Sequence, residues 1–296
     1  MSDLSITALK NRTILALTGK DVWDFLQNLV TNDMKMVNEA QCLYAALLTA
    51  QGKFLHDFII IKQGETFMID CATERKDDLI RRLTLYKLRS DVTLTETASQ
   101  VFAVYGDGAY KSANLPEKAG TVIQNGNDLY LVDPRNANLG VRIITTADFN
   151  AADDFPAATV KDEGSYEAHR LYLGIPEGGQ DIIPEKNFLL EANFEELNGV
   201  SFTKGCYVGQ ELTARTKHRA KIKKRLLRVL FDGSLEPGDA ITLDGREIAE
   251  VRSFANGQGI ALVRLENLPE GPAALKPEGV KLILPEYINL PIAEKY

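Results

Sequence analysis

The sequence predicts an α+β protein with two mixed domains followed by a small all-β domain. Strand-like runs alternate with two amphipathic helical stretches through the first 98 residues, which indicates helices packed on one face of an antiparallel sheet. From about Arg225 onward, short alternating segments are separated by glycine and Asp-Gly turns, which is typical of a small barrel. We therefore expect domains at residues 1–98, 99–225 and 226–296, and the first two are free to interleave in sequence.

The first domain is predicted from hydrophobic periodicity. The stretch DVWDFLQNLV places its apolar residues at helical spacing on one face: Val22, Phe25, Leu26, Leu29 and Val30. Strand-like runs follow in CLYAALL, KFLHDFIII and ETFMIDC, with a polar-glycine turn at residues 49–52. A second helix is expected to begin near Thr73, with that residue as its N-cap.

A similar unit is predicted for the second domain. Residues 100–105, 128–132 and 139–144 have the composition of strands, and residues 164–174 indicate a helix that ends at Gly174. The third domain contains the alternating segments RLLRVLFDG, AITLDG, REIAEVRSF and GIALVRL, with no further helical pattern.

Composition limits the function classes. Apolar residues make up 45% and charged residues 25% of the 296 residues, which is ordinary for a globular protein. The net charge of -7 argues against a protein that coats nucleic acid with its whole surface. No apolar run has the length of a membrane span, and the N-terminus lacks the pattern of a signal peptide. We therefore expect a cytoplasmic protein without a membrane association.

The three cysteines are far apart and indicate a reducing compartment rather than a disulfide framework. No CxxC pair is present, so no metal site is predicted within one chain. Cys42 and Cys71 lie in apolar strand-like runs and are assigned to the core.

Cys206 lies in KGCYVGQE, between a predicted strand end and a predicted helix start. Lys204 is close in sequence, and a neighbouring cation favours the reactive thiolate. From these residues alone, a reactive thiol and a small buried hydrophobe stay equally open.

A basic segment surrounds and follows this motif. Nine Lys or Arg residues and a single acidic one, Glu211, lie between Lys204 and Arg228. This segment would attract an anion such as polyglutamate, phosphate or RNA. The alternative is a solvated strand edge that lysines keep soluble.

Two further positions carry ionisable groups of interest. His56 and Asp57 form an acid–base pair in sequence, but adjacent strand residues point to opposite faces, so we expect them to act separately. Glu191 lies among apolar residues, where its carboxylate needs donors such as the N–H groups of a pterin. A surface glutamate is the alternative for this position.

The stretch HRLYLGIPEG…LLEANFEELNGVSFTKGCYVGQELTARTKHRAKIKKRLL resembles the signature of the folate-binding YgfZ family, which is related to the aminomethyltransferase of the glycine cleavage system. FLQNLVTND, LLTAQGKFLHDF and LYKLRSDV also resemble blocks of this family, so the resemblance covers nearly the whole chain. It is strongest with the mitochondrial branch that assists assembly of iron–sulfur proteins. The resemblance implies an aminomethyltransferase-like fold around a central channel that binds tetrahydrofolate or a polyglutamylated derivative.

The resemblance also implies roles for particular residues. Cys206 would be a functional thiol assisted by Lys204, Gln210 and Glu211, and Glu191 would meet the pterin. The remaining residues predicted to line the folate site are Asn32, Asp33, Arg89 and Tyr207. Two positions depart from the aminomethyltransferases, because His56 and Tyr172 stand where those enzymes carry acidic residues.

Three functions follow, in order of preference. The first is a folate-binding accessory factor, without ordinary catalytic turnover, for iron–sulfur proteins that include tRNA-thiolating enzymes. Its partners would be folate and iron–sulfur assembly or client proteins, with a weak or indirect link to tRNA. The second is a tetrahydrofolate-dependent aminomethyl or one-carbon transferase that uses Asp57. The third is a module that holds tRNA through Lys221, Lys223 and Lys224.

Overall fold

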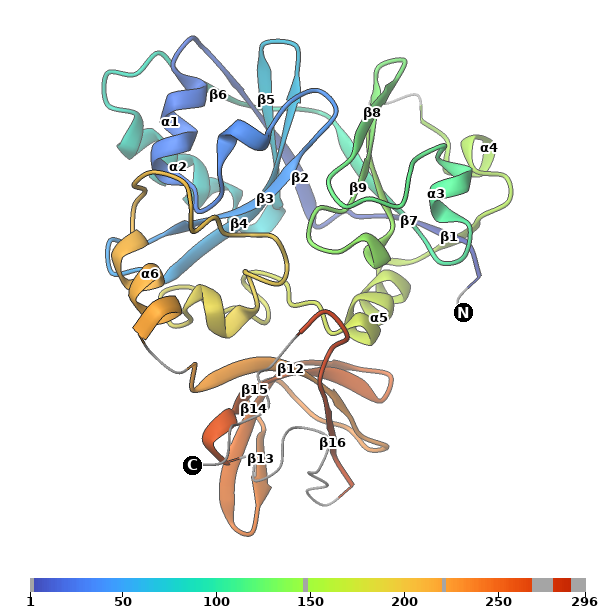
Figure 1. The fold of residues 1–296 in the computed structure, drawn as a ribbon. Helices are drawn as coiled ribbons and strands as arrows, with labels where there is room; N and C mark the ends of the chain where they lie inside the picture. The colour runs from blue at the N-terminus through green and yellow to red at the C-terminus, as the bar shows by residue number, and fades with distance from the viewer. Residues whose placement is uncertain (1–2, 146–148, 220–221, 268–278, 289–296) are drawn as a thin grey trace. The chain divides into compact units, whose positions relative to one another are not determined.

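The computed structural model describes residues 3–145, 149–219, 222–267 and 279–288. The described residues contain three β-sheets (Figure 1). The chain divides into two compact units that each combine separated segments. Unit 1 contains residues 1–48, 55–166 and 197–208, and unit 2 contains residues 49–54, 167–196 and 209–296. The predicted α+β class is confirmed, whereas the domain boundaries predicted from sequence stay predictions.

The first sheet of unit 1 has the strand order β3-β4-β5-β2-β6. Its strands are β2 (Arg12–Thr18), β3 (Leu43–Leu48), β4 (Phe54–Gln63), β5 (Thr66–Ala72) and β6 (Thr93–Glu96). Two helices, α1 (Val22–Leu29) and α2 (Lys76–Lys87), lie beside this sheet (Figure 1). The apolar face of α1 predicted from sequence is buried in the same core as the apolar residues of the sheet.

The start of α2 differs from the prediction. A 3-10 turn, η2 (Thr73–Arg75), precedes the helix, and the Thr73 hydroxyl makes hydrogen bonds with the Thr13 hydroxyl and the Lys10 carbonyl. Thr73 is therefore not the N-cap, because its oxygen is used on a neighbouring strand and the preceding loop rather than on the first turn of the helix.

The second sheet of unit 1 has the strand order β11-β1-β7-β10-β9-β8. Its strands are β1 (Ser5–Ala8), β7 (Gln100–Tyr105), β8 (Val122–Asn125), β9 (Asp128–Val132), β10 (Val141–Thr145) and β11 (Thr159–Lys161). Only the β1–β11 pair is parallel among the pairs described. The chain thus begins in this sheet, crosses to the first sheet at β2, and returns at β7.

Two short helices accompany the second sheet: α3 (Ala109–Ser112) and α4 (Ala151–Asp154). Aromatic and aliphatic residues from β7, β9 and β10 form its core, into which Phe155 packs after α4. The opposite faces of the two sheets meet around a set of buried charges described below.

Unit 2 contains a third sheet with the order β13-β14-β15-β12-β16, and all of its described pairs are antiparallel. Its strands are β12 (Lys224–Leu230), β13 (Ala240–Leu243), β14 (Arg246–Ala255), β15 (Gln258–Arg264) and β16 (Lys281–Ile283). The helix α5 (Glu163–Leu173) ends at Gly174, which has a φ of +69°, so the predicted glycine terminus is confirmed. The helix α6 (Gln210–Arg219) precedes the sheet.

None of the helices in the described residues has both the length and the apolar character required to cross a membrane.

Candidate functional site

The segment that carries Cys206 has no regular secondary structure between residues 199 and 207. Its backbone is held instead by the connection that follows α1. The Ser201 amide donates to the Thr31 carbonyl at 3.0 Å, and the Thr31 hydroxyl donates to the Gly199 carbonyl at 2.7 Å. The predicted strand end before the motif is therefore wrong, because side-chain and loop hydrogen bonds replace a β-ladder here.

Lys204 points into the interior of unit 1 and is only 6% exposed. Its ammonium group donates to three backbone carbonyls: Gln27 at 2.7 Å, Val30 at 2.7 Å and Asn32 at 2.8 Å. Burial lowers the pKa of Lys204 to about 8, and the nearby carboxylate of Asp33 acts in the opposite direction.

Tyr207 is the second buried residue of the motif, at 7% exposed, and the Lys204 nitrogen lies 5.1 Å from the centre of its ring. Gly205 and Cys206, which lie between these two residues, are both exposed. A Cβ atom at Gly205 would meet nothing within 4 Å. The Cys206 thiol is free, and the adjacent Gly205 adds no side chain that would obstruct approach to it.

The other two cysteines are buried, which confirms their predicted place in the core. Burial raises the pKa of the Cys71 thiol to about 12 and raises that of Cys42 further. Both therefore remain protonated thiols at neutral pH, so Cys206 is the one cysteine available for chemistry with another molecule.

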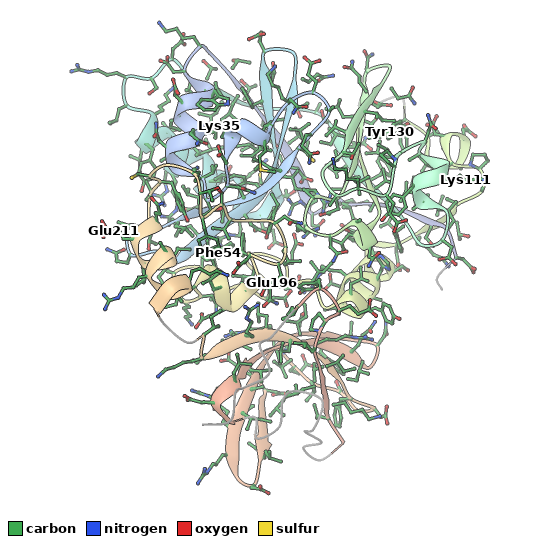
Figure 2. The ribbon with its side chains drawn as sticks, in the orientation of Figure 1. Lys35, Phe54, Lys111, Tyr130, Glu196 and Glu211 are labelled. Atoms are coloured by element: carbon green, nitrogen blue, oxygen red, sulfur yellow. The ribbon has the colours of Figure 1, made fainter. Side chains whose placement is uncertain are left out.

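The last three residues of the motif lie in unit 2, where Gln210 and Glu211 begin α6. Glu211 is exposed and lies on the outside of this helix (Figure 2). The motif is thus divided between the two units, with Lys204 and Cys206 in unit 1.

The basic segment is partly used within unit 2. Lys217 pairs with Glu195, and Arg225 is buried, pairs with Glu196 and donates to the Asn193 side chain. Lys223 is exposed. Lys221, which was predicted to contact tRNA, lies outside the described residues.

Glu191 is half-buried in the 3-10 turn η4 (Leu189–Ala192) of unit 2. Its Oε2 atom accepts from the Phe188 amide at 3.0 Å and from the Asn187 side chain at 3.4 Å. No hydrogen bond in the described part of the chain uses Oε1. The Lys53 ammonium lies 3.3 Å from the centre of the Phe188 ring, and burial lowers the Lys53 pKa while Glu191 opposes that effect. One carboxylate oxygen of Glu191 is therefore not used by the turn, and its predicted contact with a pterin stays a prediction.

The predicted folate-lining residues of unit 1 fit a ligand less well. Asn32 uses both amide hydrogens on the carbonyls of Tyr44 and Asn198, and its oxygen accepts from the Asp33 amide. It has no donor left and is almost fully buried, so this geometry does not favour a folate contact, and its predicted role in a folate channel stays a prediction.

Two of the three other unit 1 positions, Asp33 and Arg89, lie apart from each other in the chain. Asp33 caps the 3-10 turn η1 (Met34–Met36) by accepting from the Lys35 amide. Arg89 is exposed after α2, where it lines a surface hollow with Asp21, Leu88 and Ser90. The ring of Tyr207 is buried beside Lys204 in the loop of Cys206, as described above.

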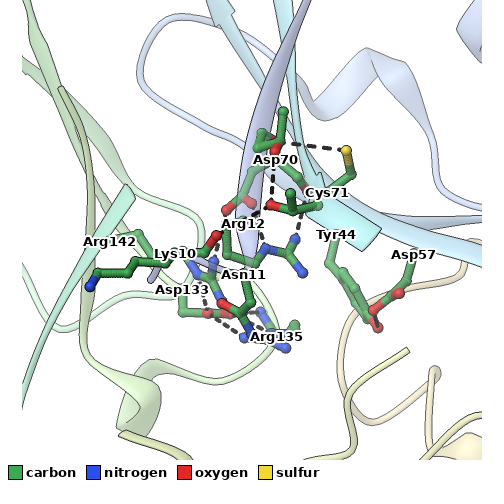
Figure 3. Close-up of polar contacts among 12 residues, drawn as sticks. Lys10, Asn11, Arg12, Tyr44, Asp57, Asp70, Cys71, Asp133, Arg135 and Arg142 are labelled. Atoms are coloured by element: carbon green, nitrogen blue, oxygen red, sulfur yellow. Dashed lines mark hydrogen bonds and ion pairs between the residues drawn. The ribbon is translucent and has the colours of Figure 1, made fainter. Parts of the chain in front are cut away.

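A buried ionic cluster between the two sheets of unit 1 was not predicted from sequence (Figure 3). Asp70 on β5 accepts from Arg12 at 2.7 Å and from Arg142 at 2.8 Å. Asp133 accepts from Arg142 at 2.8 Å and from Arg135 at 2.9 Å. The two arginines hold the pKa of Asp133 well below its usual range despite its burial. Alternation predicts only which face of a strand a residue occupies, so it did not indicate that Asp70 and Arg142, which belong to separate sheets and lie 72 residues apart, would pair.

Residues 56 and 57 face opposite sides of β4, as predicted. The His56 ring bonds Asp78 of α2 at 2.8 Å, whereas the Asp57 carboxylate accepts from the Tyr44 hydroxyl at 2.8 Å (Figure 3). Burial lowers the pKa of His56 to about 4, against the effect of Asp78, so its imidazole is neutral at pH 7. The two side chains belong to separate environments and form no acid–base pair.

Among the described residues, no group of three or more His, Cys, Asp or Glu side chains is placed to hold a metal ion.

Comparison with known proteins finds two matching families. Residues 5–112 match the GCVT N-terminal domain, and residues 223–289 match the C-terminal β-barrel domain of CAF17. Among solved structures, the glycine cleavage system aminomethyltransferase T from Bartonella henselae aligns with a TM-score of 0.80 and 14% identity, over 97% of this chain and 87% of that chain. The aminomethyltransferase-like fold with a C-terminal barrel is therefore confirmed.

Curated relatives match over most of this chain. The mitochondrial iron–sulfur cluster assembly factor IBA57 of Homo sapiens is 33% identical, over 93% of this chain and 82% of its own length. The Mus musculus protein of the same name is also 33% identical, over 93% and 81%. The homologue from Neurospora crassa is 34% identical over 75% of this chain and 52% of its own length.

Proposed function

Because this chain belongs to the IBA57 family of iron–sulfur cluster assembly factors, we propose that it acts in the assembly or maintenance of iron–sulfur proteins through the Cys206 thiol. The observation that carries the proposal is the exposure of Gly205 and Cys206 between two buried residues, Lys204 and Tyr207. This arrangement presents a free thiol at a fixed place on the surface of unit 1.

A single exposed thiol limits the chemistry that this site can perform. A thiolate is both the nucleophilic and the metal-binding form of cysteine. The other two cysteines are buried, and the described residues contain no group of ligands that completes a metal site around Cys206. Cys206 therefore supplies one sulfur to a partner protein, which provides the remaining ligands or the second sulfur.

We also propose that the protein binds tetrahydrofolate, following the resemblance to the YgfZ proteins and the aminomethyltransferase-like fold. Tetrahydrofolate, when bound, supplies a reduced pterin that carries one-carbon units. The free Oε1 atom of Glu191 supports this proposal, because a carboxylate oxygen accepts from pterin N–H groups. The tRNA-thiolating enzymes are proposed as iron–sulfur clients on the same resemblance.

The one-carbon transferase is the less favoured function. Asp57 is buried and its carboxylate already accepts a hydrogen bond from Tyr44, while His56 is committed to Asp78 on the other face of β4. Direct tRNA binding is also less favoured, because Lys217 and Arg225 of the basic segment are paired within unit 2.

The cytoplasmic location predicted from sequence is wrong. The curated relatives of this family are named as mitochondrial proteins, which points to mitochondria instead. The prediction depended partly on three unpaired cysteines, and this feature indicates a reducing environment without distinguishing one reducing compartment from another.

The test is a rescue assay in a host strain that lacks the gene. Activity of a [4Fe–4S] enzyme such as aconitase is measured with plasmid-borne wild type, Cys206→Ala, or the buried-thiol control Cys42→Ala. We expect at least a tenfold loss of rescue for Cys206→Ala and retained rescue for Cys42→Ala at equal protein levels. Full rescue by Cys206→Ala would refute the proposed role of the thiol.

Folate binding is tested separately by titrating tetrahydrofolate into the purified chain under reducing conditions. Glu191→Gln should weaken binding at least tenfold, because the amide replaces an acceptor oxygen, whereas Glu286→Gln at an exposed position of unit 2 should not. Equal affinity of wild type and Glu191→Gln would remove Glu191 from the proposed folate site.

A further inference from the structure

The Lys204 side chain closes the carbonyl end of α1. The last carbonyls of a helix have no partner within the helix and carry partial negative charge. The Lys204 ammonium donates hydrogen bonds to three backbone carbonyls. One belongs to Gln27 in the last turn of α1, and the other two belong to Val30 and Asn32, which follow the helix. An ammonium group has three N–H donors, and each of these carbonyls takes one. The group is therefore saturated by the backbone of unit 1.

This attachment reaches Cys206 through the chain. Cys206 is two residues after Lys204, in a stretch where neither a strand nor a helix fixes the backbone. The Lys204 amide adds a hydrogen bond to the Ser201 hydroxyl at 3.2 Å, so backbone and side chain of this residue are both held. Gly205 and Cys206 are themselves exposed, and a Cβ atom at Gly205 would meet nothing within 4 Å. The position of the thiol thus depends on the buried residues beside it.

We propose that Lys204 is the positioning residue of the Cys206 thiol, which it holds at a fixed place by anchoring the loop to the end of α1. The inference rests on the function proposed above for Cys206. Lys204 acts through the backbone, since its three donors are occupied and none is left for a thiolate. This differs from the role suggested by sequence, in which the cation itself favours the thiolate.

The anchor explains why lysine suits this position. A methionine of similar length would leave the three carbonyls without their charged donor and would remove the attachment of the loop. Local opening of a segment held by few contacts needs little free energy, so loss of the anchor should loosen residues 201–208 before it unfolds the unit. A thiol on a loosened loop spends less time in the geometry that a partner's acceptor group requires.

The experiment compares Lys204→Met with Lys35→Met in the full chain by amide hydrogen exchange. Lys35 is an exposed lysine of the same unit, shortly after α1, and serves as the matched control. We expect at least tenfold faster exchange in peptides that cover residues 27–32 and 201–208 for Lys204→Met, with no change for Lys35→Met. Unchanged exchange in both peptides would overturn the proposal.

A second measurement separates positioning from charge. The rate of Cys206 alkylation by iodoacetamide is followed against pH in wild type and Lys204→Met. Positioning predicts that the midpoint of this profile stays within 0.3 pH units, on the order of a 0.4 kcal/mol difference. A midpoint that moves up by a full unit, with exchange unchanged, would make Lys204 a charge partner of the thiol and would overturn the proposal.

Should Lys204→Met fail to fold, Lys204→Gln provides the second variant, because its shorter side chain keeps two N–H donors. It should raise exchange in the same two peptides by a smaller factor, and exchange equal to wild type would again count against the anchor. The rescue assay distinguishes the two proposals. Full aconitase rescue by Cys206→Ala together with a loosened loop in the Lys204 variant would remove the proposed function and leave the anchor. Loss of rescue by Cys206→Ala, together with normal exchange of residues 201–208 in the Lys204 variant, would keep the proposed function and remove the anchor.

Discussion

Unit 1 uses buried cations in two different ways. In the ionic cluster between the sheets, Arg142 bridges two aspartates, so each charge faces an opposite charge and the group is closed to solvent. In the loop of Cys206, the Lys204 ammonium donates to three neutral carbonyls, with the Asp33 carboxylate nearby, and the residues next to it in the chain are exposed. The closed cluster joins elements of the fold, whereas the anchored loop presents a reactive group. The same comparison separates the substitutions that should alter folding from those that should alter function.

The largest effect on stability is expected from breaking the closed cluster. Asp70→Asn removes the charge that Arg12 and Arg142 share, and leaving a buried charge without its partner costs roughly 3–5 kcal/mol of the free energy of unfolding. Urea unfolding at pH 7 measures this loss. The exposed Asp77→Asn is the control, and a loss below about 1 kcal/mol for Asp70→Asn would show that the cluster does not stabilise unit 1.

A pH-dependent effect is expected at His56. Burial lowers its pKa to about 4, so the unfolded chain takes up a proton between pH 6.5 and 4 while the folded chain does not. Stability from this group is therefore full above pH 6.5 and falls by up to about 3 kcal/mol as the pH drops to 4. His56→Gln can still donate to Asp78 and does not titrate. Its unfolding free energy should depend less steeply on pH in this interval, and an unchanged slope would contradict the assignment.

A smaller effect on stability is expected at the cysteines, where a buried thiol is compared with an exposed one. Cys42→Ala removes a fully buried side chain and should lower the free energy of unfolding by about 1 kcal/mol. Cys206→Ala should change it by less than about 0.5 kcal/mol, since the side chain is exposed. Thermal unfolding of the reduced proteins tests both values. A larger loss at Cys206 would mean that its thiol takes part in holding the loop.

The smallest effect on stability is expected at Gly205. A Cβ atom there meets open space, so Gly205→Ala should leave the free energy of unfolding within about 0.5 kcal/mol of wild type. Aconitase rescue should fall although stability is unchanged, because the added methyl group obstructs the approach of a partner to Cys206. Normal rescue by both Gly205→Ala and Gly205→Val would show that the partner does not approach along this side.

Much of the fold could be predicted from local patterns. The apolar spacing of α1, the glycine end of α5 and the alternating strands of the third sheet each depend on neighbouring residues in the chain. The start of α2 could not be predicted in this way, because the Thr73 hydroxyl has two partners: Thr13, which lies 60 residues earlier, and Lys10, which lies 63 residues earlier.

The candidate site was predicted only in part. The sequence singled out Cys206 through its motif, and burial of Cys42 and Cys71 followed from their apolar surroundings. The saturation of Asn32 was not visible, because the amide and its partner Asn198 are 166 residues apart. The free oxygen of Glu191 likewise depends on which of its two carboxylate atoms the turn uses.

The sequence by itself determined the α+β class, the third sheet and the one motif with a cysteine worth testing. The tertiary structure decided what Lys204 does, because its contact with Gln27 spans 177 residues. Hydrophobic periodicity reports which face of an element is buried, and it contains no information on which distant carbonyl a buried cation will meet. Those partners are set when the elements pack, and their geometry separates the anchored thiol from the two buried ones.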